Sequence, residues 1–198
     1  MKEFLVETSA RHVHVTQETV EVLFGAGHQL EVRNMLSQPG QYAATDKVTV
    51  IGYNKKDPEG PRPSQVLTIL GPTRKSNQVE LSFTDARSLG ISAPVRESGD
   101  VKGSGKCTLK GPAGEVDLEE GVIIAKRHIH MTTKDAEEYG VSNGQIVAVE
   151  IDTGLGRKLV FDDTVIRVSD TFALAMHIDT DECNACCGAG KVFGKIVK

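Results

Sequence analysis

The chain has 198 residues, a formal net charge of −4 and only 5% aromatic residues. This length is sufficient for one large domain or two small ones with a real hydrophobic core. Because there is no basic stripe and no apolar run as long as a membrane span, we expect a globular protein that binds neither nucleic acid nor membrane.

Short Val- and Ile-rich runs between glycine-marked turns predict a mostly β protein. In the first half we expect strands at 3–15, 29–32, 47–51, 65–70 and 79–82, a helix at 16–24, a polar loop at 54–63, and a helical turn at 84–90 capped by Thr84 or Asp85. In the second half we expect strands at 121–131, 145–151, 159–161, 164–168, 174–178 and 191–197, and a helix at 132–139.

One motif occurs twice in the chain, as RHVHVT at residues 11–16 and as RHIHMT at residues 127–132. Side chains at i and i+2 of a β-strand point to the same face, so each copy can aim two imidazoles at one point. The pairs are His12 with His14 and His128 with His130. A single His-x-His pair is about equally consistent with a metal site and with ordinary histidines. Two copies in matched contexts favour metal, because two imidazoles are half of a zinc site.

The two copies open an internal repeat. Each continues with a threonine, Thr16 or Thr132, then a short helix, a glycine, and a second strand. The threonine hydroxyl should cap the helix, and Gly25 and Gly140 should end the helices in a left-handed conformation. His28 is expected to be an exposed loop residue without a role. Short strands with few helices favour closed barrels, which have no exposed edges, so we predict two tandem β-barrel domains with short capping helices.

A fifth histidine, His177, lies in a further predicted strand, AMHIDTDE. Together with the two pairs it makes five, which is more than one tetrahedral zinc ion needs. Glu80 could add a carboxylate, although its position opposite Val79 and Leu81 on a strand would usually be a solvated one. Arg74 lies in the turn GPTRKSN, whose donors suit an oxyanion. The residues alone therefore indicate a zinc enzyme that acts near a phosphate or carboxylate.

Across residues 9–190 the chain resembles the PduL-type phosphotransacylase family, the phosphate propanoyltransferases. The resemblance is carried by RHVHVT, LSQPGQ, LGPTR followed by QVELS, RESGD, AKRHIHMT and AMHIDTDE. It implies an acyltransferase that exchanges coenzyme A for inorganic phosphate on short acyl groups and carries two zinc ions. It also implies two β-barrel domains, one of residues 11–125 and one of residues 1–10 with 126–198. We expect a homodimer.

The resemblance also implies roles for individual residues. One zinc ion would be held by His12, His14 and Glu80, and the second by His128, His130 and His177. The attacking phosphate would be bound by Arg74, with Ser98 near the same pocket, and coenzyme A would be contacted by Ser9, Leu70 and Asn184.

The chain departs from the family pattern in three places. Asn34 stands where the family usually has lysine, and Thr68 where it usually has arginine, both at coenzyme A contacts. The family tail is apolar or small where this chain has Cys183, Cys186 and Cys187. These thiols could form a third metal site, but we favour packing residues, because cytoplasmic cysteines commonly behave as small buried hydrophobes.

The segment MKEFLVETSA has no apolar signal-peptide core, so we expect a cytoplasmic protein without a disulfide framework. Many relatives enter bacterial microcompartments through an N-terminal extension. With almost nothing before Ser9, this chain would reach such a lumen by another route.

Two other functions are compatible with these residues. A structural zinc protein is disfavoured, because structural sites are often rich in cysteine and need no phosphate-binding turn. A zinc-dependent hydrolase that activates water to cleave a thioester or a phosphate-containing substrate is the main alternative.

Overall fold

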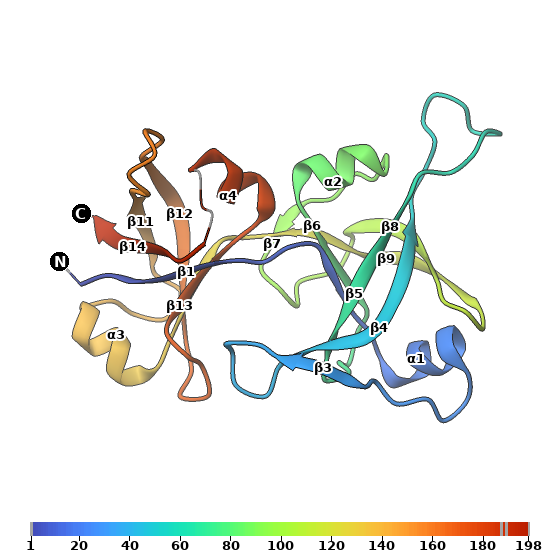
Figure 1. Cartoon of the computed structure of the whole chain (residues 1–198), viewed down its shortest axis with the longest axis horizontal. Coiled ribbons are helices and arrows are strands. Elements are labelled where there is room, and N and C mark those ends of the chain that lie inside the picture. Colours follow the sequence, from blue (N-terminus) through green and yellow to red (C-terminus); the bar gives the residue numbers. More distant parts are fainter. Residues whose placement is uncertain (1, 187, 189, 198) are drawn as a thin grey trace. The chain divides into compact units, whose positions relative to one another are not determined.

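The structure is a computed structural model that describes residues 2–186, 188 and 190–197. Its elements in chain order are β1 (Phe4–Thr8), β2 (His12–His14), α1 (Gln17–Phe24), β3 (Val32–Met35), β4 (Tyr42–Ile51), β5 (Ser64–Gly71), β6 (Gln78–Leu81), α2 (Phe83–Ser88), β7 (Val95–Arg96), β8 (Gly105–Lys110), β9 (Glu115–Ala125), β10 (His128–Met131), α3 (Thr133–Tyr139), β11 (Ile146–Ile151), β12 (Leu159–Val168), β13 (Ala175–Ile178), α4 (Thr180–Ala185) and β14 (Val192–Val197) (Figure 1). None of these helices is long and apolar enough to cross a membrane.

The chain divides into two compact units, one of residues 11–125 and one of residues 1–10 with 126–198. The first is built on a closed ring of six strands. In this ring β4 pairs with β5, β5 with β2, β2 with β6, β6 with β9, and β9 with β8, which returns to β4. β3 and β7 extend the sheet from β4 and β9. The ring is filled by fully buried side chains that include Val13, Ile69, Val79, Leu109 and Val122.

The second unit is a closed barrel with the strand order β1-β13-β10-β12-β11-β14. β1 comes from the start of the chain and completes the ring, parallel to β13 and antiparallel to β14. Its core contains Ile129, Met131, Val149, Ile166 and Met176, all fully buried. The prediction of a mostly β protein with two barrels and short helices is confirmed.

The internal repeat has the same local structure in both units. β2 lies between the parallel strand β5 and the antiparallel strand β6, and β10 lies between the parallel strand β12 and the antiparallel strand β13. The hydroxyls of Thr16 and Thr132 cap α1 and α3, as predicted. Gly140 is left-handed at φ 67° and ψ 40°. Gly25 is not, because it leaves its helix at φ 111° and ψ 155°, a region that is also essentially restricted to glycine.

Two long strands predicted from the sequence are each broken in two. The expected strand 3–15 is β1 followed by β2, and the expected strand 121–131 is β9 followed by β10. Both breaks, at residues 9–11 and 126–127, fall where the chain passes from one unit to the other. Neither break is marked by a turn-forming sequence, so the sequence predicted one continuous strand across each of them.

Conversely, the two strands predicted at 159–161 and 164–168 are one strand, β12. Asp162 and Asp163 together face Ala148 of β11, and Asp163 has a φ of 52°. This is a β-bulge, which lets the strand continue past a pair of residues that resembles a turn.

Three further predictions were wrong in detail. β3 begins at Val32, where the predicted strand ends. The N-cap of α2 is Ser82, whose hydroxyl accepts the Asp85 N–H at 3.2 Å, and not Thr84 or Asp85. α4 was missed, although Asp179 and Glu182 form the capping box that begins it.

Candidate metal and anion-binding site

The first histidine pair meets Glu80 across β2 and β6. His12 lies opposite Glu80 in the antiparallel register. The Nε2 atoms of His12 and His14 are 3.1 Å apart, and Glu80 Oε2 is 3.4 Å from His12 Nε2. Bonds of about 2.0–2.1 Å to a tetrahedral zinc ion would place its ligand atoms roughly 3.3 Å apart. The spacing therefore fits a metal site.

Glu80 is 9% exposed, so the interpretation of a solvated strand residue is wrong. Burial by itself raises the pKa of a carboxyl group. The charge and hydrogen bond of His12, the charge of His14 and a hydrogen bond from Ser98 outweigh burial and hold the pKa of Glu80 well below its usual range. Glu80 is therefore an ionised, buried carboxylate that faces two imidazoles.

The orientation of His14 suits a ligand. Its Nδ1 lies 3.1 Å from the carbonyl oxygen of Leu70. Because a carbonyl only accepts, Nδ1 carries the hydrogen and Nε2 presents its lone pair to the cluster, as in many metal sites. Burial, followed by the charges of His12 and Arg74, lowers the pKa of His14 to about 3, so the ring is neutral at pH 7.

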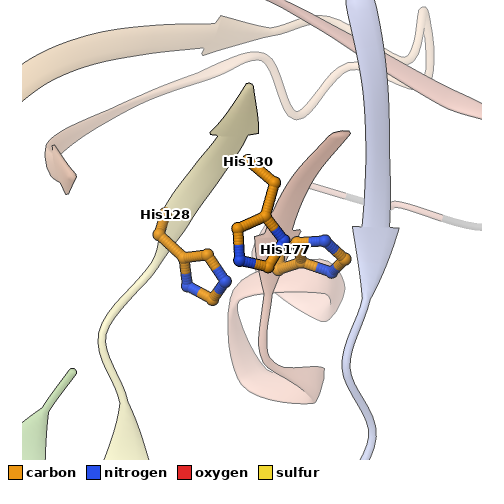
Figure 2. A group of neighbouring side chains, drawn as sticks. All are labelled: His128, His130 and His177. Atoms are coloured by element: carbon orange, nitrogen blue, oxygen red, sulfur yellow. The ribbon is translucent and has the colours of Figure 1, made fainter. Parts of the chain in front are cut away.

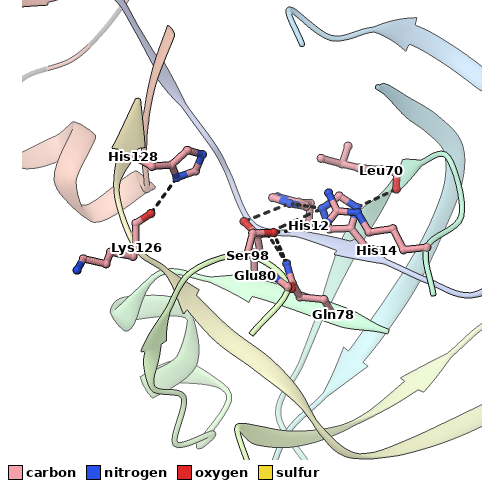
Figure 3. A network of polar contacts seen from close by, with 10 residues as sticks. His12, His14, Leu70, Gln78, Glu80, Ser98, Lys126 and His128 are labelled. Atoms are coloured by element: carbon pink, nitrogen blue, oxygen red, sulfur yellow. Dashed lines mark hydrogen bonds and ion pairs between the residues drawn. The ribbon is translucent and has the colours of Figure 1, made fainter. Parts of the chain in front are cut away.

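A hydrogen-bond network joins this cluster to the predicted phosphate-binding arginine. Arg74 Nη1 donates to Ser98 Oγ at 3.2 Å, and Ser98 Oγ donates to Glu80 Oε1 at 3.0 Å. The amide of Gln78 donates to Glu80 Oε1 and to Ser98 Oγ, and accepts the Gly99 N–H (Figure 3). Sequence reasoning missed Gln78. The signal was its position two residues before Glu80, on the same face of the strand.

The second histidine pair meets His177 across β10 and β13. The three rings lie close together (Figure 2). Their centroids are 4.6 Å apart for His128 and His130, 4.9 Å for His130 and His177, and 5.2 Å for His128 and His177. His128 Nδ1 donates to the Lys126 carbonyl at 2.9 Å, which leaves Nε2 as the ligand atom. Burial, then the charges of His128 and His177, lowers the pKa of His130 to about 2. Within the described part of the chain, the buried Nδ1 of His130 has no hydrogen-bond partner, as expected of an atom that awaits a metal.

Each unit brings its third residue from an equivalent position. The residue that faces the first histidine across the antiparallel strand joins the cluster. The facing pairs are His12 with Glu80 and His128 with His177. In both clusters the candidate ligand atoms lie within 4.8 Å of one another. The residues that face the second histidine differ, because this position is Gln78 in the first unit and Ala175 in the second.

The residues predicted to contact coenzyme A are placed as follows. Ser9 donates its backbone N–H to the Ile178 carbonyl at 2.8 Å, and Asn184 is exposed on α4. Leu70 lies beside His14, and its carbonyl oxygen accepts a hydrogen bond from the His14 ring. No coenzyme A contact is tested by these positions, so this part of the assignment stays a prediction.

Cys183, within α4, and Cys186, directly after it, pack as small side chains. Cys186 is fully buried, and the Cys183 thiol donates to the Gly188 carbonyl at 2.9 Å. Among the residues described, neither belongs to a group of candidate metal ligands. Cys187 lies outside the described residues, so the proposed third metal site is not tested there.

His28 is not the exposed residue that the sequence suggested. It is half-buried, its ring stacks on Phe24 with centroids 5.0 Å apart, and its Nε2 lies 2.8 Å from Asp46 Oδ1.

Comparison with known proteins identifies the family of the chain. The family model of phosphate propanoyltransferase matches residues 5–189. A phosphate propanoyltransferase of Listeria monocytogenes is 48% identical over 98% of this chain and 86% of its own length. Those of Thermotoga maritima and Clostridioides difficile are 50% and 47% identical, over 91% and 98% of this chain and 82% and 88% of their own lengths. The chain therefore belongs to the phosphate propanoyltransferase family of acyltransferases.

Proposed function

We propose that this protein transfers a propanoyl or similar short acyl group between coenzyme A and inorganic phosphate. The observation that carries the proposal is the connection of Arg74, through the Ser98 hydroxyl, to Glu80 of the first cluster. It joins an anion-binding guanidinium to a candidate metal site within one unit. Relatives that carry this activity in their names support the choice of reaction.

In the direction of acyl phosphate formation, a phosphate oxygen attacks the carbonyl carbon of the thioester. A carbon–oxygen bond forms, the carbon–sulfur bond breaks, and coenzyme A leaves as a thiolate. Arg74 would hold the phosphate, because a guanidinium presents N–H donors in a fork that matches phosphate oxygens. Holding the nucleophile in place lowers the entropic part of the barrier.

We also propose that both clusters bind zinc, so that each chain holds two ions. The ligands would be His12, His14 and Glu80 in the first site and His128, His130 and His177 in the second. Imidazole and carboxylate are ligands that zinc accepts, and sites with three protein ligands are typical of catalytic zinc. The chemistry that zinc supplies when bound is Lewis-acid stabilisation of the departing thiolate.

Coenzyme A would be contacted by Ser9, Leu70 and Asn184. Asn34 and Thr68, which replace the family's usual basic residues, would weaken the grip on the anionic nucleotide, since neither carries a charge. The homodimer, and the location in the cytoplasm or a microcompartment lumen, stay predictions from the family resemblance.

A thiol-release assay tests the proposed reaction. Zinc-loaded protein is incubated with propanoyl-CoA, with and without phosphate, and acyl phosphate is trapped with hydroxylamine. We expect free thiol and acyl phosphate in equal amounts, and only when phosphate is present. Thiol release without phosphate would instead support the hydrolase, and no release under either condition would refute the proposal. A series of acyl-CoA chain lengths then identifies the preferred acyl group.

A further inference from the structure

Gln78 is a buried polar residue at the centre of the first cluster's network. It is 1% exposed and lies on β6, two residues before Glu80 and opposite His14. A buried amide is costly unless its hydrogen bonds are made. All of those bonds are made to the residues around the cluster, which gives Gln78 one specific orientation.

The bonds involve both ends of the amide. Nε2 donates to Glu80 Oε1 at 2.6 Å and to Ser98 Oγ at 2.8 Å, and Oε1 accepts the Gly99 N–H at 2.7 Å. A flipped amide would set its N–H groups against the Gly99 N–H and its oxygen against the carboxylate. The three partners therefore determine which way the amide points.

These bonds affect how Glu80 can bind a metal. Its Oε1 receives both Gln78 and Ser98 and lies 3.9 Å from His14 Nε2, whereas its Oε2 lies 3.4 Å from His12 Nε2, close to the spacing of two ligands of one metal ion. Because two donors already use Oε1, Oε2 is the oxygen that is better placed to bind the metal. Glu80 is thereby arranged as a ligand through a single oxygen.

The same bonds hold the serine beside the arginine. Ser98 Oγ accepts from Gln78 and from Arg74, and donates its own hydrogen to Glu80. The adjacent Gly99 N–H is held by the amide oxygen of Gln78. One side chain thus fixes the segment that contacts the predicted phosphate-binding arginine.

We infer that Gln78 is a positioning residue that keeps Glu80 a single-oxygen metal ligand and aligns the Ser98–Arg74 pair with the first cluster. The inference rests on the proposed function. The second cluster has Ala175, whose side chain carries no amide, at the equivalent position. Loss of Gln78 should therefore weaken metal binding at the first cluster and the use of phosphate. Metal binding at the second cluster should be unchanged.

The test replaces Gln78 by methionine, which has similar length and no amide. The matched control is Gln65→Met, which removes a glutamine-to-serine hydrogen bond, Gln65 Nε2 to Ser88 Oγ at 2.8 Å, from the same unit. Zinc affinity is measured by chelator competition on the loaded full-length protein. Phosphate and propanoyl-CoA dependence are measured separately, and cobalt-substituted protein reports the metal's coordination number by its visible spectrum.

For Gln78→Met we expect one zinc ion to be bound more weakly by a factor on the order of 10 to 100, the usual effect of losing an outer hydrogen-bond partner. The other ion should be unchanged. The KM for phosphate should rise by about 10-fold or more while the KM for propanoyl-CoA stays within about twofold. The cobalt spectrum should weaken as Glu80 becomes free to bind through both oxygens. The Gln65→Met protein should match the wild type in each measurement.

Unchanged zinc affinity and unchanged phosphate KM in Gln78→Met would overturn the inference. Equal weakening of both ions would do the same, because it would indicate a general loss of structure. If Gln78→Met does not fold, Gln78→Asn is used, since its shorter amide cannot reach Glu80 and Ser98 together. If the wild type lacks phosphate-dependent thiol release, the proposed function fails, whereas the zinc and cobalt measurements still decide the role of Gln78 in the first cluster.

Discussion

Replacing Glu80 by glutamine tests the carboxylate on which the first site depends. The change keeps the shape of the side chain and removes its charge. In the structure, Glu80 Oε1 accepts hydrogen bonds at 2.6 and 3.0 Å, from Gln78 and Ser98. The new amide oxygen can accept both. Its NH2 group then takes the place of Oε2, which lies 3.4 Å from His12 Nε2, and directs hydrogens at the cluster.

The expected effects are a large loss of metal affinity at the first site and some loss of stability of the metal-free protein. Losing an outer partner of a ligand typically costs about 10- to 100-fold in affinity, and replacing the ligand itself should cost at least ~100-fold. That corresponds to at least about 2.7 kcal/mol. The free energy of unfolding of the metal-free protein should fall as well, because His12, His14 and Ser98 favour the ionised carboxylate in the folded state and glutamine carries no charge.

The assay is metal analysis after chelator competition, combined with thiol release in both directions of the reaction. We expect Glu80→Gln to retain about one zinc ion, at the histidine-only site, and to lose turnover in both directions. The second site provides an internal control for folding. A Glu80→Gln protein that holds two zinc ions with wild-type affinity and turns over normally would refute the assignment of Glu80 as a ligand.

Three other predictions follow from the same sites. His12→Ala and His128→Ala should each remove about one of two zinc ions, measured by mass spectrometry of the metal content. Arg74→Ala should reduce phosphate use by about two to three decades, or ~2–4 kcal/mol, with little change in acyl-CoA binding, and Arg74→Lys should restore only part, because lysine lacks the fork. The metal-free protein should lose stability as the pH falls below 6.5. The buried rings of His14 and His130 have folded pKa values of about 3 and about 2, so they stay neutral in the folded state and take up protons on unfolding. The free energy of unfolding, from urea titrations between pH 7 and 5, should fall by up to ~1.4 kcal/mol per pH unit for each ring.

Each of these predictions can fail in a definite way. Two retained zinc ions and full activity in His12→Ala or His128→Ala would contradict the two-site arrangement. An unchanged phosphate dependence in Arg74→Ala would remove Arg74 from the site. A metal-free protein whose stability is flat between pH 7 and 5 would show that the imidazoles of His14 and His130 gain water or a proton acceptor in the folded state. His14→Gln is the control, because it should remove one ring's share of the pH dependence.

The features that could be predicted from the sequence are those determined by neighbours in the chain. The two His-x-His pairs share a face because strand geometry alone places i and i+2 together. The caps at Thr16 and Thr132 depend on residues within one helical turn, and both predictions are confirmed. The barrel fold was predicted from short strands and many turns, which also depend on residues that are neighbours in the chain.

The third residue of each cluster depends on something else, the register between strands far apart in the sequence. His12 and Glu80 are 68 positions apart and His128 and His177 are 49 apart, yet each pair is opposed across two strands. From the residues alone, the simpler interpretation of Glu80 was a solvated strand residue. Only the family resemblance assigned it as a metal ligand. Gln78 was not noticed, because its position two residues before Glu80 becomes informative only when Glu80 is itself taken to face the cluster.

Tertiary structure also decided where strands stop. The breaks at residues 9–11 and 126–127 lie where the chain leaves one unit for the other, and the bulge at Asp162 and Asp163 lies opposite β11. The two breaks carry no turn signal in the local sequence, whereas the Asp162–Asp163 pair resembles a turn although the strand continues through it. The sequence by itself thus indicated the two histidine pairs and Arg74 as candidates for binding metal and anion. Strand pairing decided which of them meet, because hydrogen-bonded register sets the distance between side chains that the chain keeps far apart.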